Sequence, residues 1–153
     1  MNRKILLLPI TLLMALIAPS ISAQSDEVGE IRALLERVAT LMQAGDLESL
    51  NDIYSDGPGV HIIEGAGVNH GWVDYRDHHL TPELEAFKNF KYRFFAIEPQ
   101  IRGDLAYTAL RYELSADLES GHIEREGRGT FVLEKMNGEW RIVHTHTSGR
   151  AKQ

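Results

Sequence analysis

The stretch MNGEWRIVHTHTSG, residues 136–149, decides the fold, because it contains the strongest hairpin signal in the chain. Asn137-Gly138 is a dipeptide that two-residue hairpin turns favour, since both central residues of such a turn need a positive φ. An alternating strand over residues 139–147 follows it. We therefore predict an antiparallel hairpin in which Met136 pairs with Glu139.

This turn also predicts which side chains share a face of the sheet. Continuing the pairing residue by residue places Phe131 opposite His144 and Gly129 opposite His146. The face that receives both imidazoles also carries the bulky side chains of the hairpin, so we expect it to face the core, with free space beside Gly129. The opposite, outer face would then be formed by Val132, Val143 and Thr145.

Upstream of the hairpin, the apolar pattern changes from helical to alternating near Phe90. Strands are predicted over residues 91–102, 106–118 and 122–136. Helices are predicted over residues 26–44, 47–54 and 72–87, the last interrupted at Pro82. A short strand is expected over residues 60–64, and Gly65-Ala66-Gly67 is typical of a loop. Helices followed by strands indicate one α+β domain with helices on one face of a curved antiparallel sheet.

The first 23 residues have the pattern of a secretory signal peptide. Arg3 and Lys4 precede an apolar run over residues 5–18, and small residues follow up to Ala23. About 14 apolar residues are too few to span a bilayer, so no stable membrane anchor is expected. We predict a single domain over residues 24–153 that is exported, and periplasmic if the source is Gram-negative.

Composition excludes several functions of this 153-residue chain. It contains no cysteine, which rules out disulfides and thiolate metal sites, and its formal charge of −6 argues against a broad nucleic-acid interface. Phosphate-loop, dinucleotide and nucleophile-elbow motifs do not occur in the sequence. Seven histidines are an unusually high number for this length.

The order of elements, the segment AGDLESLNDIY (residues 44–54) and the ending GEWRIVHTHTSG (138–149) resemble the SnoaL-like and nuclear transport factor 2-like families. The ending is also similar to the association domain of calcium/calmodulin-dependent kinases. The resemblance implies a conical α+β fold closed by the helices around a pocket, and a homodimer through the outer sheet face. It does not choose among isomerases, cyclases, dehydratases and non-catalytic binding modules.

Three functional classes remain open, and whether the domain is an enzyme remains open with them. The leading one is an exported small-molecule-binding domain whose pocket supports acid–base chemistry. His144 or His146 would transfer the proton, Asp74, Asp77 or Glu64 would orient the imidazole, and Tyr112 would donate to an oxyanion. The remaining pocket residues are expected to be Trp72, Tyr75, His78, His79 and Phe131.

The second class is a protein that binds zinc or copper. His144-x-His146 on one strand presents two imidazoles to the same side, and His78 and His79 are available as further ligands. The third class is a non-catalytic dimerisation or interaction module, as the similarity to the kinase association domain implies.

Overall fold

The computed structural model describes residues 21–153, with side chains from Gln24 onward. Most of the predicted signal peptide, residues 1–20, lies outside the described residues. Among the helices of the described part, none is long and apolar enough to cross a membrane. The homodimer that the family resemblance implies stays a prediction.

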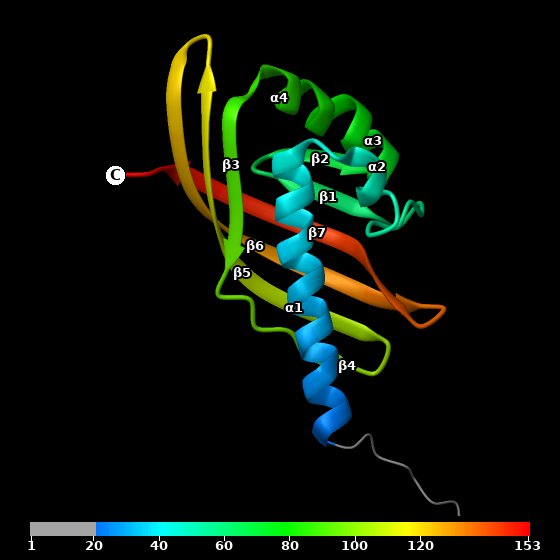
Figure 1. The fold of residues 1–153 in the computed structure, drawn as a ribbon. Helices are drawn as coiled ribbons and strands as arrows, with labels where there is room; N and C mark the ends of the chain where they lie inside the picture. Colours follow the sequence, from blue (N-terminus) through cyan, green and yellow to red (C-terminus); the bar gives the residue numbers. More distant parts are fainter. Residues whose placement is uncertain (1–20) are drawn as a thin grey trace, which may run out of the picture.

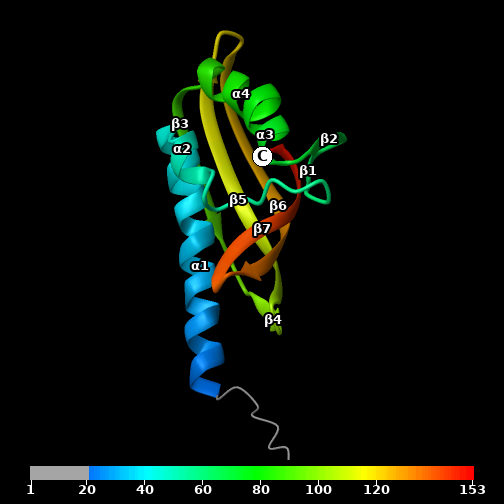
Figure 2. The same ribbon diagram turned by 90° about the vertical axis from the view of Figure 1, so that its right-hand side faces the viewer.

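Helix α1 (Ile21–Ala44) runs along one face of the sheet (Figures 1 and 2). Its apolar stripe packs Ile31, Leu35 and Val38 into the core with no exposed surface, as the three- and four-residue spacing predicts. The chain leaves the helix at Gly45, which has the positive φ of 70° that glycine tolerates. Asp46 then caps α2 (Leu47–Leu50) by accepting from the Ser49 amide at 3.1 Å.

The sheet of the described residues has seven strands, with β2 at one edge and with β3 and β4, which both pair with β5, at the other. Six strands follow the order β2-β1-β7-β6-β5-β3, and β4 pairs with β5. All the pairings are antiparallel except that of β1 with β7. The strand bounds are β1 His61–Glu64, β2 Gly67–His70, β3 Lys88–Phe95, β4 Gln100–Arg102, β5 Leu105–Leu118, β6 Gly121–Met136 and β7 Glu139–Ala151. This curved sheet with helices on one face confirms the predicted α+β class.

The helix predicted over residues 47–54 ends at Leu50, and two further predicted segments differ from the structure. The Gly65-Ala66-Gly67 segment, predicted as a loop, contains the turn of a hairpin between β1 and β2, with Gly65 at a φ of 58°. The strand predicted over residues 91–102 is split into β3 and β4, because Ala96 takes a φ of 52° and Pro99 has no amide proton to donate to a ladder.

The prediction that His144 and His146 face the core is wrong. Pairing proceeds as predicted from Met136–Glu139 to Leu133–Ile142, and then a bulge shifts the register so that Val132 pairs with His144. One extra residue reverses the facing of every later side chain, because side chains alternate with a period of two. Both imidazoles therefore lie on the outer face.

The same shift brings Thr145 and Thr147 onto the inner face. Thr145, predicted to face outward, is only 3% exposed and pairs with Phe131. The space expected beside Gly129 is filled, since a Cβ there would lie 2.9 Å from the Phe131 ring and 3.3 Å from Thr147 Cγ2.

Candidate functional site

The inner face of the sheet and the helices above it enclose a cavity of about 40 Å³. Helices α3 (Trp72–Tyr75), η1 (Arg76–Leu80) and α4 (Thr81–Ala86) lie over one end of this face (Figure 1). Most of the lining is aromatic or aliphatic: Met42, Tyr54, Ile62, Leu80, Leu84, Phe87, Phe90, Tyr92, Phe94, Leu114 and Phe131. The polar part of the lining is Glu64, Tyr75, Glu83, Thr145 and Thr147. Such a cavity suits a mainly apolar ligand with one polar group.

Two carboxylates and one phenol line the polar end of the cavity, and one imidazole contacts both carboxylates without being a lining residue itself. His79 Nε2 lies 3.4 Å from Glu64 Oε2 and 3.6 Å from Glu83 Oε1. The Tyr75 hydroxyl donates to Glu64 Oε2 at 3.2 Å. All these residues except the buried Tyr75 are partly exposed, so the group lies where the cavity opens toward solvent.

Helical spacing gathers three of these residues on one face. Tyr75, His79 and Glu83 follow one another at intervals of four, and the rings of Tyr75 and His79 lie 5.1 Å apart. The segment η1, which contains His79 and lies between Tyr75 and Glu83, is a π-helical turn. Such local widening of a helix is frequent at functional sites. Glu64 completes the group from the end of β1.

Burial changes the acidity of two of these side chains. The pKa of Glu83 is raised, first by desolvation and then by the charge of Glu64, while His79 acts in the opposite direction. Burial, followed by the charge of Glu64, raises the pKa of the Tyr75 phenol well above its usual value, so this phenol stays protonated and donates. The group can therefore share a proton between a carboxylate and an imidazole.

The same group has the donors for a divalent cation. One atom from each of Glu64, His79 and Glu83 lies within 4.8 Å of the others. A donor set with one imidazole and two carboxylates suits a harder ion such as manganese.

Because the pKa of Glu83 is higher in the folded chain than in the unfolded one, its protonation favours folding. The stabilisation that protonated Glu83 gives the folded chain is fully present below the pKa of the unfolded state. It is lost as the pH rises through the raised pKa of the folded state. Glu83→Gln should therefore gain stability relative to the wild type at pH 8 and lose that advantage at pH 4.5. Urea denaturation at both pH values measures this, with the exposed Glu85→Gln on the same helix as the control. An equal difference at both pH values would contradict the expectation.

Three residues expected in the pocket lie elsewhere. Trp72 is buried behind it, stacked on Tyr54 at 4.3 Å. The side chain of His78 is 75% exposed and contacts Asp74 Oδ1 at 3.0 Å. Asp74 also accepts from the His70 amide at 3.0 Å, so it joins α3 to β2 instead of orienting a catalytic imidazole.

Of the predicted pocket residues, Tyr75 and Phe131 line the cavity. His79 is not a lining residue but contacts Glu64 and Glu83, which are. Tyr112, predicted to stabilise an oxyanion, lies on the inner face but is not among the lining residues. Glu83 was not predicted. Its spacing of four from His79 is the signal that would have identified it.

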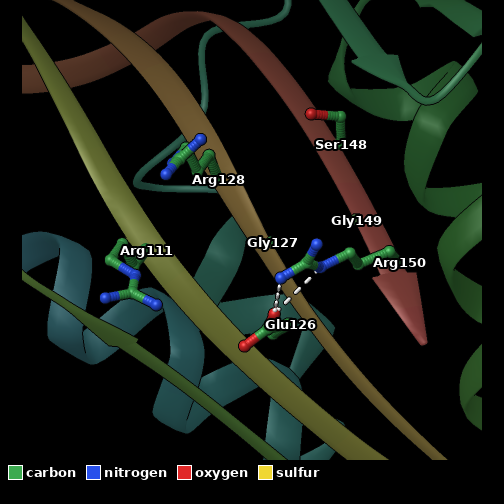
Figure 3. A pocket seen from close by; sticks show the side chains of 7 residues that line it. All are labelled: Arg111, Glu126, Gly127, Arg128, Ser148, Gly149 and Arg150. Carbon is green, nitrogen blue, oxygen red and sulfur yellow. Dashed lines mark hydrogen bonds and ion pairs between the residues drawn. The ribbon is translucent and has the colours of Figure 1, made fainter. Parts of the chain in front are cut away.

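A larger, open groove of about 380 Å³ lies on the outer face over β5, β6 and β7 (Figure 3). Its charged side chains are Arg111, Arg128, Arg150 and Glu126, and Arg150 is paired with Glu126 at 2.7 Å. Its lining residues include no imidazole and no pair of carboxylates that could exchange a proton. The inner cavity is therefore the better candidate for chemistry.

Comparisons with known proteins agree on the fold. Residues 31–151 match the family model described as a SnoaL-like domain. None of the curated proteins compared with the chain matches it.

Solved structures with the same fold come from several bacteria. A nuclear transport factor 2-like superfamily protein from Salmonella enterica aligns with a TM-score of 0.77 and 22% identity, covering 85% of this chain and 95% of that one. A candidate ketosteroid isomerase from Shewanella frigidimarina aligns with a TM-score of 0.61 and 23% identity, over 84% and 96% of the two chains. A candidate dehydratase from Streptomyces avermitilis aligns with a TM-score of 0.72 and 14% identity, over 82% and 98%.

Proposed function

This chain belongs to the SnoaL-like family, and on that basis we propose that it binds a small, largely apolar carbonyl compound in its inner cavity and transfers a proton there. The observation that carries the proposal is the convergence of Glu64, His79 and Glu83 at the polar end of an otherwise aromatic cavity. Structurally similar proteins described as a candidate isomerase and a candidate dehydratase support chemistry of this class.

Each group has a role that its environment favours. The His79 imidazole removes a proton from the carbon next to the carbonyl, and Glu64, 3.4 Å away, stabilises the imidazolium that forms. Glu83 donates a hydrogen bond to the developing enolate oxygen from its protonated form, which its raised pKa makes more accessible than in a free carboxyl group. The His79 imidazole and the Glu83 carboxyl thereby divide the base and acid roles.

The aromatic lining sets the size of the ligand. Phe131 forms part of the cavity wall, is 2% exposed and contacts the Phe94 ring edge-on at 5.4 Å. A cavity of about 40 Å³ between such rings is narrow, so we expect a ligand with a single ring or a short chain. Phe87 and Phe90, which are only partly buried, are the side chains best placed to move aside for it.

Exchange of the α-protons of cyclohexanone for deuterium, followed by NMR in deuterated water, tests this proposal without knowledge of the natural substrate. We expect catalysed exchange by the wild type and a loss of about 100-fold in His79→Ala, the range typical of a general base. His78→Ala is the matched control, because its side chain is 75% exposed and outside the cavity. No exchange above the buffer rate, or equal rates in both variants, would favour a non-catalytic binding module.

A further inference from the structure

Four of the seven histidines lie together on the outer face of the sheet, away from the inner cavity. The register pairs His70 with His61 across β2 and β1, and His61 with His144 across β1 and β7. His146 is two residues further along β7, on the same face. Three imidazoles therefore stand in one row across three adjacent strands, with a fourth beside them, and we call these four residues the histidine row.

Strand geometry places the side chains of each neighbouring pair in this row close together on the same face. His61 and His70 are opposite one another on antiparallel strands, where Cβ atoms lie about 4.5–5.5 Å apart. His61 and His144 are opposite one another on parallel strands, which lie about 4.8 Å apart. Residues i and i+2 on one strand project to the same side. The His61 and His70 rings already lie 5.1 Å apart. The imidazoles of His70 and His146 are exposed, which leaves them free to rotate toward a shared ion.

The backbone orients the central imidazole. His61 Nδ1 lies 3.0 Å from the Gly59 carbonyl oxygen, which fixes the tautomer in which Nδ1 carries the proton and Nε2 keeps its lone pair. Histidines that bind metals commonly donate their second ring N–H to a carbonyl in this way. The His70 amide is held by Asp74, which fixes the end of β2 that carries the second imidazole.

Uncharged side chains border the row on the outer face. The register positions next to it on the outer face are occupied by Ile63, Val68, Thr130 and Val132, none of which carries a charge. Imidazole nitrogens without a carboxylate ligand suit zinc and copper(II).

We propose that the histidine row binds one zinc or copper(II) ion in each chain, through His61, His144 and at least one of their neighbours His70 and His146. The ligands differ from those that the sequence favoured, because His78 and His79 lie on η1, with His79 at the inner cavity. The site is also independent of the proposed proton transfer, since it shares no residue with the Glu64–His79–Glu83 group.

Calorimetric titration of chelator-treated protein with zinc chloride tests the site. We expect one ion per chain in the wild type and an affinity at least about 10-fold weaker in His61→Ala. His78→Ala and His79→Ala should bind zinc as the wild type does. Absence of stoichiometric binding, or a loss in His79→Ala with His61→Ala unaffected, would overturn the proposal, and the latter would place the ion in the cavity.

A second measurement needs no variant and so does not depend on how well His61→Ala folds. Substoichiometric copper(II) should broaden the imidazole proton NMR signals of His61 and His144 and leave that of His122 sharp. His122 is a suitable internal control because it lies at the far turn between β5 and β6, bound to Asp117 at 2.6 Å. Broadening centred on His122 or His79 would contradict the assignment.

Discussion

Replacing Trp72 with alanine is expected to destabilise the fold by about 3–5 kcal/mol, the usual cost of removing a buried tryptophan. The side chain is 2% exposed, and its ring stacks on that of Tyr54 at 4.3 Å. Its Nε1 donates to Asn51 Oδ1 at 2.7 Å. Trp72 therefore joins α3 to the segment after α2, and its loss leaves a cavity where these elements meet. Urea denaturation followed by far-UV circular dichroism measures the change.

Trp72→Phe separates packing from hydrogen bonding at this position. Phenylalanine keeps one ring stacked on Tyr54 and loses the bond to Asn51, whose carbonyl oxygen still accepts from Arg76 Nη1 at 2.9 Å. We expect this variant to lose about 1 kcal/mol from the hydrogen bond, plus part of the packing energy. If Trp72→Phe were as unstable as Trp72→Ala, stacking on Tyr54 would not be the source of the stability.

Gly127→Ala is expected to cost about 3 kcal/mol, at the upper end of what overpacking a folded core usually costs. A Cβ at residue 127 would lie 2.3 Å from the Ser148 carbonyl oxygen and 2.4 Å from the Tyr112 ring. The first of these contacts is with the backbone of a neighbouring strand, which cannot move without breaking the β6–β7 ladder. The melting temperature measured by circular dichroism should fall accordingly.

Gly59→Ala is the matched control for Gly127→Ala. A Cβ at residue 59 meets nothing within 4 Å, and this glycine does not have a positive φ. Its replacement should leave the melting temperature unchanged or slightly higher, because alanine restricts the unfolded chain. Equal losses in the two variants would mean that Tyr112 and Ser148 do not confine residue 127.

Local signals in the sequence predicted most of the elements. The apolar spacing of residues 26–44 predicted α1, and Asn137-Gly138 predicted the β6–β7 hairpin with the correct first pairs. These features depend on neighbouring residues, since helix faces and two-residue turns are determined within a few positions. The family resemblance rested on the same local patterns, which is why it pointed to the right fold.

The identity of the site depended on the tertiary structure. A bulge between His144 and Ile142 turned His144 and His146 outward, and a strictly alternating pattern contains no mark of where such an extra residue occurs. Thr145 and Thr147 occupy the inner-face positions of β7 instead. They lie between β6, which carries Phe131, and β1, which is parallel to β7. Glu64 and Glu83 met at His79 only because β1 and α4 are brought to the same end of the cavity. By itself the sequence determined the elements and their order, whereas packing across the sheet decided which side chains share a face.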